Sequence, residues 1–187
     1  MADYFVHEKA LVETDVIGRD STIWAFTHIL KGAKIGNNVN INDHCFVEND
    51  VIIGDNVSVK CGVYLWDGVR LEDDVFIGPA ATFTNDLLPR SKNKEYIQKK
   101  IVVKKGASIG ANVTTLGGVT IGQYALIGAG TVVTKDVPAF ALVYGNPGII
   151  QGYVCVCAQK IDTAQSVFTC VCKRKYMIEN GSITLKE

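Results

Sequence analysis

The chain has 187 residues, of which 48% are hydrophobic and 20% charged, and its formal net charge is zero. This size fits one domain with a small appendage, and the balanced charge gives no reason to expect nucleic acid or an anionic membrane as a partner. No apolar run approaches the roughly 20 residues that a membrane-spanning helix needs. The first residues, MADYFVHEK, do not read as a signal peptide, so we expect a cytoplasmic protein whose six cysteines are mostly reduced.

Apolar residues recur at every sixth position along most of the chain. The first run starts at Leu11 and ends at Phe83, and the second leads from Val103 to Val133 with one polar member, Thr115. A series of smaller apolar residues lies two positions before the first series, and glycine often follows the larger residue. A period of six fits neither a helix nor a lone alternating strand. It fits a short strand and a corner, repeated.

Three such hexapeptides predict one turn of a triangular prism, because Gly18, Gly36 and Gly54 lie 18 residues apart. Both apolar series then point inward, since side chains two positions apart on a strand share a face. Over about residues 11–137 the pattern resembles the hexapeptide-repeat family, which implies a left-handed parallel β-helix. We therefore expect an all-β fold with a β-helix domain over 1–150, an extruded loop and a small C-terminal extension over 151–187.

The six-residue rule breaks at FTNDLLPRSK, which begins at Phe83. Val103 lies 20 residues beyond Phe83, whereas an uninterrupted run would need 18 or 24. We therefore expect part of residues 84–100 to leave the prism as a loop, and long loops in compact domains are usually functional or disordered. In the acyltransferases that the chain resembles, such a loop lies near the active site and reaches the neighbouring subunit.

Polar residues gather at the root of this loop. Residues 18 apart should stack on successive turns, about 4.8 Å apart if the turns pair like parallel strands. Two stacks then share one corner, and their members are Asn49, Asp67 and Asn85 and, beside them, Glu48, Trp66 and Thr84. The face that ends at this corner carries a third stack of His28, Phe46, Tyr64 and Thr82, with His44 two residues away in phase. Any one of these residues could be a solvated corner, but the cluster favours a site.

The last turns carry the segment VTIGQYALIGAGTVVTKDVPAFALVYGNP, which resembles the closing segment of acetyl-CoA-dependent hexapeptide acyltransferases. The resemblance implies that acetyl-CoA is the co-substrate. It also implies that four residues line the path of the pantetheine arm and the phosphates, namely Ala111, Ala129, Thr134 and Lys135. Small side chains would let the thin pantetheine arm lie along the prism, and the lysine would meet phosphate charge.

The expected loop contains no histidine, since its root reads Thr84-Asn85-Asp86. In related O-acetyltransferases a loop histidine is the general base that a weakly acidic sugar hydroxyl needs. An asparagine cannot take a proton, but its amide can hold an amine by hydrogen bonding. A neutral amine is already a good nucleophile. The missing histidine therefore predicts an N-acetyltransferase that acts on an amino sugar, with Asn85 orienting the amine.

Several segments resemble nucleotide-linked 3-amino-sugar N-acetyltransferases, among them TIWAFTHI, PRSK and LWDGVRLEDDVFIGPAATFTND. LWDG and FTND are closer to the branch that acts on dTDP-linked 3-amino-3,6-dideoxyhexoses than to the UDP-linked 3-amino-uronate branch. This resemblance implies an acetamido sugar for surface glycans such as lipopolysaccharide, made by a homotrimer with active sites between subunits. It implies the catalytic candidates Asn85, His28 and Asn49. It implies the substrate-binding candidates Glu48, His44, Trp66, Asp67, Thr84 and Asp86.

Three rival functions stay open on the sequence. A sugar or small-molecule O-acetyltransferase could use His28 or His44 as its base. A γ-type carbonic anhydrase on the same prism would need three converging histidines, and His7 lies far from the other two in repeat count. A scaffold trimer without activity would not bind acetyl-CoA.

The tail contains four cysteines in a CxC-x12-CxC pattern, at Cys155, Cys157, Cys170 and Cys172. Two cysteine pairs are typical of a zinc ribbon, but the usual knuckle is CxxC. The glycine that would help to close each turn is replaced by Ala158 and Lys173. The alternation in YVCVC and FTCVC equally suits a β-hairpin with half-buried cysteines. We expect a hairpin without metal, with zinc as the less favoured alternative.

Overall fold

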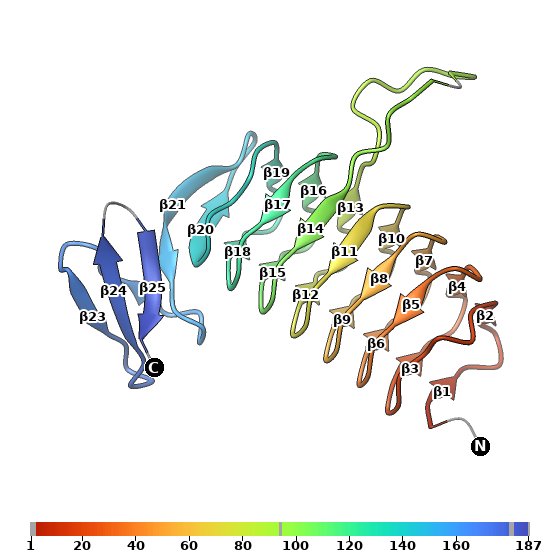
Figure 1. Ribbon diagram of the computed structural model, residues 1–187, viewed down its shortest axis with the longest axis horizontal. Coiled ribbons are helices and arrows are strands. Elements are labelled where there is room, and N and C mark those ends of the chain that lie inside the picture. Colours follow the sequence, from red (N-terminus) through yellow and green to blue (C-terminus); the bar gives the residue numbers. More distant parts are fainter. Residues whose placement is uncertain (1–2, 94, 180–181, 187) are drawn as a thin grey trace.

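The computed structural model describes residues 3–93, 95–179 and 182–186 (Figure 1). Residues 1–2 of the expected β-helix domain, residue 94 of the expected loop, and residues 180–181 and 187 of the expected tail lie outside the described residues. Every regular element in the described ranges is a strand. In that part of the chain no helix is long and apolar enough to cross a membrane.

Short strands wind into a left-handed parallel β-helix with three faces, as the hexapeptide period predicts. The first face consists of β1 (Phe5–Val6), β3 (Thr22–Ile23), β6 (Asn40–Ile41), β9 (Ser58–Val59), β12 (Phe76–Ile77), β15 (Ser108–Ile109), β18 (Leu126–Ile127) and β20 (Ala141–Tyr144). The second face consists of β2 (Leu11–Val12), β4 (His28–Ile29), β7 (Phe46–Val47), β10 (Tyr64–Leu65), β13 (Thr82–Phe83), β16 (Thr114–Thr115) and β19 (Val132–Val133). The third face consists of β5 (Lys34–Ile35), β8 (Ile52–Ile53), β11 (Val69–Leu71), β14 (Ile101–Val103) and β17 (Thr120–Ile121).

The two apolar series fill the inside of the prism, except at their start. Leu11 was expected to point inward but is 58% exposed, and Val12 packs on the core in its place, because the first turn is one residue short. Ile41, Val59 and Ile77 follow one another on the first face and are fully buried. Burying such a side chain contributes about 1.5–3 kcal/mol, and the six-residue period repeats this gain on every face of every turn. Backbone hydrogen bonds join successive turns, as between Asn40 N and Val57 O at 2.9 Å. The stack of side chains is therefore held in register by the same bonds that build the sheets.

The corners require a left-handed backbone conformation, which asparagine and aspartate tolerate better than most residues. Between the third and first faces this conformation falls on Asn38, Asn56 and Asp74, with φ of 51°, 58° and 60°. Their side chains form a ladder, in which each asparagine amide donates to the next residue at 2.9 and 3.0 Å. Beside it, the backbone N–H of Asn37 donates to Asp55, and this bond lowers the pKa of the Asp55 carboxyl.

The loop is an insertion within one turn of the prism. Arg70 pairs with Ile52 on the turn before and with Val102 on the turn after, and the second step along the chain is much the longer of the two. Phe83 and Val103 therefore lie on adjacent faces, where a single hexapeptide normally suffices. The comparison with 18 or 24 residues could not reveal this, because spacing alone does not tell which face the chain rejoins. Figure 1 shows the loop projecting from the prism between β13 and β14.

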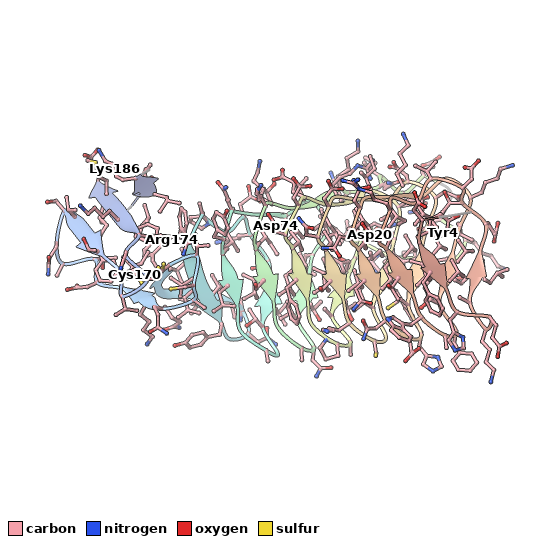
Figure 2. The ribbon with its side chains drawn as sticks, turned by 90° about the horizontal axis from the view of Figure 1, so that it is seen from below. Tyr4, Asp20, Asp74, Cys170, Arg174 and Lys186 are labelled. Carbon is pink, nitrogen blue, oxygen red and sulfur yellow. The ribbon has the colours of Figure 1, made fainter. Side chains whose placement is uncertain are left out.

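The tail is larger than the expected hairpin. After β20 the chain turns back as β21 (Ile149–Val154), which pairs antiparallel with β20 and with β22 (Lys160–Ile161). Three further strands form a separate antiparallel sheet, namely β23 (Val167–Thr169), β24 (Lys175–Glu179) and β25 (Ser182–Lys186). Figure 2 shows Cys170 and Arg174 in this tail, at the end of the molecule opposite Tyr4.

An aromatic stack joins the tail to the last turns of the prism. Phe140 lies against Tyr124 with ring centroids 5.5 Å apart and nearly parallel planes. On its other side Phe140 meets the ring of Tyr176, which is fully buried, edge-on at 5.5 Å. The tail thus shares a small second core with the prism.

Candidate active site

The root of the loop is bonded to the next turn of the prism. Thr84 N donates to Thr115 O at 3.0 Å, and the Thr84 hydroxyl accepts from Gly117 N at 3.0 Å. The returning strand of the loop is bonded too, since Lys99 N donates to Asn85 O at 2.8 Å. Asn85 is half-buried. Its backbone is therefore held at the point where the two ends of the loop meet.

One corner of the prism, between the second and third faces, carries most of the candidate residues. We call it the loop corner, and its successive turns present Asn49, Asp67, Asn85, Gly117 and Lys135, each two residues after a strand of the second face. The stacking that the sequence predicts for the asparagines and the aspartate therefore follows from the strand register. The same stack continues to Lys135, two turns beyond Asn85, which corresponds to about 10 Å.

The carboxylates of the loop corner bind the backbone of the corner itself. Glu48 Oε2 accepts from Asp67 N at 2.6 Å, and Asp67 Oδ1 accepts from Asp50 N at 2.5 Å. Asn49 Oδ1 accepts in the same way from Gly32 N at 3.1 Å. These contacts shape the corner, so in this structure Glu48, Asp67 and Asn49 serve as supports of the site.

Arg70 is a further candidate residue of the active site, and the sequence analysis did not single it out. Its guanidinium lies on β11 beside the loop corner, where Nη2 contacts Asp50 Oδ1 at 2.5 Å and Nη1 donates to the carbonyl oxygen of Asp50. The ion pair fixes the guanidinium on Asp50, whose backbone nitrogen donates to Asp67. No signal in the hexapeptide pattern could have found it, because position 70 is an ordinary outward position of a strand.

A hollow of about 410 Å³ lies on the N-terminal half of the second face. We call it the aromatic hollow, and its lining includes Phe26, His28, His44, Phe46, Tyr64 and Trp66. Strand pairing confirms the predicted stack of His28, Phe46, Tyr64 and Thr82. The ring of His44 stacks on that of Phe26, with centroids 4.9 Å apart. Burial raises the pKa of Cys45, on the floor of the hollow, to about 11, so this thiol is not a nucleophile at neutral pH.

His28 has a carboxylate partner, Glu13, which the sequence analysis missed. The distance between His28 Nε2 and Glu13 Oε1 is 2.7 Å. The first turn has a register of 17 instead of 18, since Leu11 pairs with His28. This register sets Glu13 level with Leu30, so counting along the repeat could not have paired it with His28.

The three catalytic candidates do not meet in one chain. His28 lies three turns from Thr82 along its stack, which corresponds to about 14 Å. Asn49 lies two turns from Asn85 in the loop corner. Within one chain, then, only Asn85 lies at the root of the loop. His28, His44 and Trp66 form a separate group in the aromatic hollow.

The distal part of the loop is exposed and carries apolar side chains. Leu88 is 80% exposed and Ile97 74% exposed. Asp86 Oδ1 accepts from Leu88 N at 2.9 Å, so this carboxylate caps the start of the loop. A small domain rarely exposes such residues together without a partner surface.

The cofactor candidates flank the C-terminal strands of the second face. Ala111 and Ala129 lie on successive turns of the corner before this face, where Gly130 N donates to Ala111 O at 2.9 Å. Thr134 and Lys135 are exposed on the loop corner after it. The strands β16 and β19 lie between the two pairs. The two pairs therefore border one surface from its two opposite corners.

Comparison with known proteins decides the family. The bacterial transferase hexapeptide model, with six repeats, matches residues 16–49 and 100–135. The chain is 53% identical to dTDP-3-amino-3,6-dideoxy-α-D-galactopyranose 3-N-acetyltransferase of Aneurinibacillus thermoaerophilus, over 96% of this chain and 94% of that enzyme. The chain belongs to the hexapeptide-repeat transferases.

Solved structures of hexapeptide-repeat transferases share this fold. An acetyltransferase from Vibrio cholerae, in complex with acetyl coenzyme A, is 30% identical with a TM-score of 0.56, over 73% of this chain and 69% of that one. An N-acyltransferase from Bacillus cereus, in complex with dTDP and coenzyme A, has a TM-score of 0.60 at 20% identity, over 80% of this chain and 82% of that one. The second likeness shows the fold alone.

Proposed function

We propose that the protein transfers the acetyl group of acetyl-CoA to the 3-amino group of a dTDP-linked 3-amino-3,6-dideoxyhexose, for surface glycans. The observation that carries this proposal is the 53% identity to an enzyme named for that reaction, over 94% of the length of that enzyme. That relative acts on the galacto sugar, and we propose the same configuration at C4 here. The loop root with Asn85 in place of a histidine supports an amine as the acceptor.

The proposed reaction needs little help from the protein once the amine is neutral. The amine nitrogen attacks the thioester carbonyl carbon, the carbon–sulfur bond breaks, and the departing thiolate takes the proton that the nitrogen loses. Asn85 holds the amine toward the thioester through its side-chain amide. Thr84 is bonded to the next turn of the prism and Lys99 N to Asn85 O, and these bonds keep the backbone of Asn85 in place.

The two substrates are proposed to approach the loop root from opposite ends. Acetyl-CoA lies on the C-terminal side, with its pantetheine arm near Ala111 and Ala129 and its phosphates near Lys135. The nucleotide sugar lies on the N-terminal side, where the aromatic hollow offers Trp66 and Tyr64 as apolar surfaces for a base or a sugar ring. In this arrangement His28 and His44 bind the nucleotide sugar and lie away from the reacting nitrogen.

We further propose a homotrimer whose active sites lie between subunits, in the cytoplasm, where acetyl-CoA is available. The exposed Leu88 and Ile97 of the loop support a subunit contact, because burying an apolar loop tip against a neighbouring subunit is favourable.

An acetylation assay over a panel of nucleotide sugars tests the function. The panel contains dTDP- and UDP-linked 3-amino sugars in the gluco and galacto forms, and a dTDP-linked analogue with a hydroxyl at C3. We expect the dTDP-linked galacto amine to have the highest kcat/KM. If the UDP-linked 3-amino-uronate is the best acceptor, the protein belongs to the UDP-linked branch and the proposed substrate is wrong.

One observation favours a second candidate, acetyl transfer to a hydroxyl. The contact of 2.7 Å between His28 and Glu13 resembles a base held by a carboxylate. This candidate predicts acetylation of the hydroxyl analogue and its loss in His28→Ala. If only the amine is acetylated, the second candidate is wrong.

A further inference from the structure

The four cysteines of the tail converge on one point. Cys155 Sγ lies 3.4 Å from the sulfur of Cys172 and 3.4 Å from that of Cys157. Cys157 Sγ lies 3.6 Å from that of Cys170, and all four sulfurs lie within 4.8 Å of one another. A disulfide needs a separation of about 2.05 Å. Four thiolates around a tetrahedral ion at about 2.3 Å lie roughly 3.8 Å apart.

From this arrangement we propose that Cys155, Cys157, Cys170 and Cys172 bind one structural zinc ion. The sequence analysis favoured a hairpin without metal, and the structure leads us to the opposite proposal. Tetrahedral sites with four sulfurs suit zinc or iron, and zinc binds such a site more tightly than ferrous iron does.

The two cysteine pairs sit in matching turns. In the first, Cys155 N donates to Gln159 O at 2.8 Å and Ala158 N donates to Cys155 O at 2.8 Å. In the second, Cys170 N donates to Arg174 O at 2.9 Å and Lys173 N donates to Cys170 O at 2.8 Å. Two turns of the same build, from separate parts of the tail, thus aim their sulfurs at one centre.

The residues that counted against zinc adopt the conformation that glycine would supply. Ala158 has a φ of 65° and Lys173 a φ of 71°. These angles lie in the left-handed region, which is unfavourable for side chains other than glycine, asparagine and aspartate. The same backbone conformation at equivalent places of both turns shows that the two turns share one geometry.

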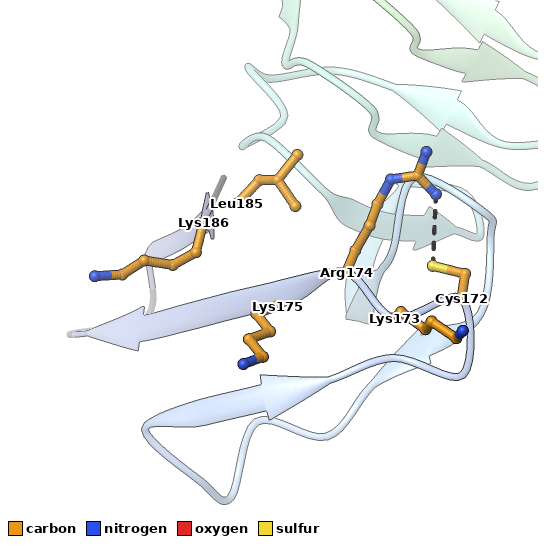
Figure 3. Close-up of a pocket in the computed structure, with 6 residues that line it drawn as sticks. All are labelled: Cys172, Lys173, Arg174, Lys175, Leu185 and Lys186. Carbon is orange, nitrogen blue, oxygen red and sulfur yellow. Dashed lines mark hydrogen bonds between the residues drawn. The ribbon is translucent and has the colours of Figure 1, made fainter.

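The surroundings suit the negative charge of a zinc ion with four thiolates. Arg174 Nη1 lies 3.5 Å from Cys172 Sγ, as Figure 3 shows, and the Tyr176 hydroxyl donates to Cys155 Sγ at 2.9 Å. Lys173, Lys175 and Lys186 line the adjacent cavity of about 600 Å³. Donors and positive charges around metal-bound sulfurs stabilise the thiolate form.

The tail also needs a cross-link of this kind. Its own core is small, with six buried side chains shared with the prism, namely Phe140, Cys155, Ile161, Cys170, Tyr176 and Ile183. Small units of this size usually depend on a disulfide or a metal for stability. The zinc ion would join the turn after β21 to the turn before β24. Because Tyr176 packs against Phe140, the ion would also stabilise the contact between the tail and the last turn of the prism.

The metal content of the purified full-length chain tests the proposal. After dialysis against metal-free buffer, we expect inductively coupled plasma mass spectrometry to find one zinc ion per chain. The double variant Cys157→Ser/Cys172→Ser should lose the zinc. The matched control Cys61→Ser, which changes an exposed cysteine of the prism, should retain it. A chain without zinc, or with one iron ion in place of zinc, would overturn the proposal.

A second measurement needs no variant. The four tail thiols should be protected from a thiol reagent in the native chain and become reactive when a chelator removes the zinc, whereas Cys61 should react in both states. Tail thiols that react as fast as Cys61 before chelation would contradict the proposal. Neither measurement depends on turnover, so the results are independent of the proposed acetyl transfer.

Discussion

The hydroxyl oxygen of Thr84 accepts a hydrogen bond from the backbone nitrogen of Gly117 at 3.0 Å. The first residue of the loop is therefore bonded to the following turn of the prism, although 33 residues separate the two in sequence. A loop that is bonded at its root and exposed at its tip combines a precise position for Asn85 with a tip that can meet a partner.

Replacing Asn85 by alanine should lower kcat about tenfold with the fold intact. The change removes one oriented hydrogen bond to the amine, and one such bond contributes about 0.5–1.5 kcal/mol. Steady-state kinetics with the dTDP-linked amine would measure the loss. Asn93→Ala is the matched control, because Asn93 accepts from Glu95 N inside the loop, far from its root. Wild-type kcat in Asn85→Ala would remove Asn85 from the catalytic role.

Replacing Gly117 by alanine should lower kcat with little loss of stability. A Cβ at this position would lie 2.8 Å from Lys99 Cβ and 3.0 Å from Thr84 O, so the loop root would have to shift. Gly118→Ala separates this effect from backbone strain. Gly118 has a φ of 92° and no atom within 4 Å of its added Cβ. The control should lower the melting temperature, at a cost of about 1–3 kcal/mol, and leave kcat unchanged. Equal kcat in both variants would contradict the placement of the loop root.

Replacing Lys135 by alanine should raise the KM for acetyl-CoA by about 10- to 100-fold and leave the KM for the sugar unchanged. The loss of a contact between a lysine and a phosphate costs about 1.5–3 kcal/mol. The matched control is Lys31→Ala. Lys31 is an exposed lysine on an earlier turn of the loop corner, two residues after β4. If both variants have the same KM for acetyl-CoA as the wild type, Lys135 does not bind the cofactor.

Replacing Thr115 by valine should raise the melting temperature. Thr115 is the polar exception in the inward series, is fully buried, and has a hydroxyl without a hydrogen-bond partner among the described residues. Removing an unsatisfied buried hydroxyl at constant shape contributes about 1 kcal/mol. Thermal unfolding at a fixed chain concentration measures the shift.

Thr131→Val is the control for this change. Thr131 is equally buried, but its hydroxyl donates to Gly128 O at 2.7 Å. The variant should therefore be less stable than the wild type. Destabilisation by Thr115→Val would mean that its hydroxyl has a partner in the working protein.

The prism could be predicted from the sequence because its rule is local. An inward residue at every sixth position and a turn of three hexapeptides predict the stack from His28 to Thr82, and strand pairing confirms it. The loop corner follows in the same way, since each of its residues stands two positions after a strand. This holds for Asn49, Asp67 and Asn85. Gly117 and Lys135 lie beyond the loop, across which a step of 18 residues no longer connects one turn to the one before it.

Where a turn departs from 18 residues, its length is determined by packing and not by the repeat. The first turn is one residue short, so that Leu11 pairs with His28. The turn with the loop is longer than its neighbours and rejoins the prism on the adjacent face, where Arg70 pairs with Val102. A repeat cannot predict its own interruptions, because the chain that leaves it is positioned by contacts with other parts of the molecule.

The tail shows the same division most clearly. The sequence alone establishes that four cysteines lie in two pairs and that Ala158 and Lys173 stand where glycine is usual. The folded chain was needed to learn that both turns adopt the glycine-like backbone and that their sulfurs meet. The reason is physical: two turns far apart in sequence are brought together by a shared core around Tyr176, and no local pattern encodes that contact.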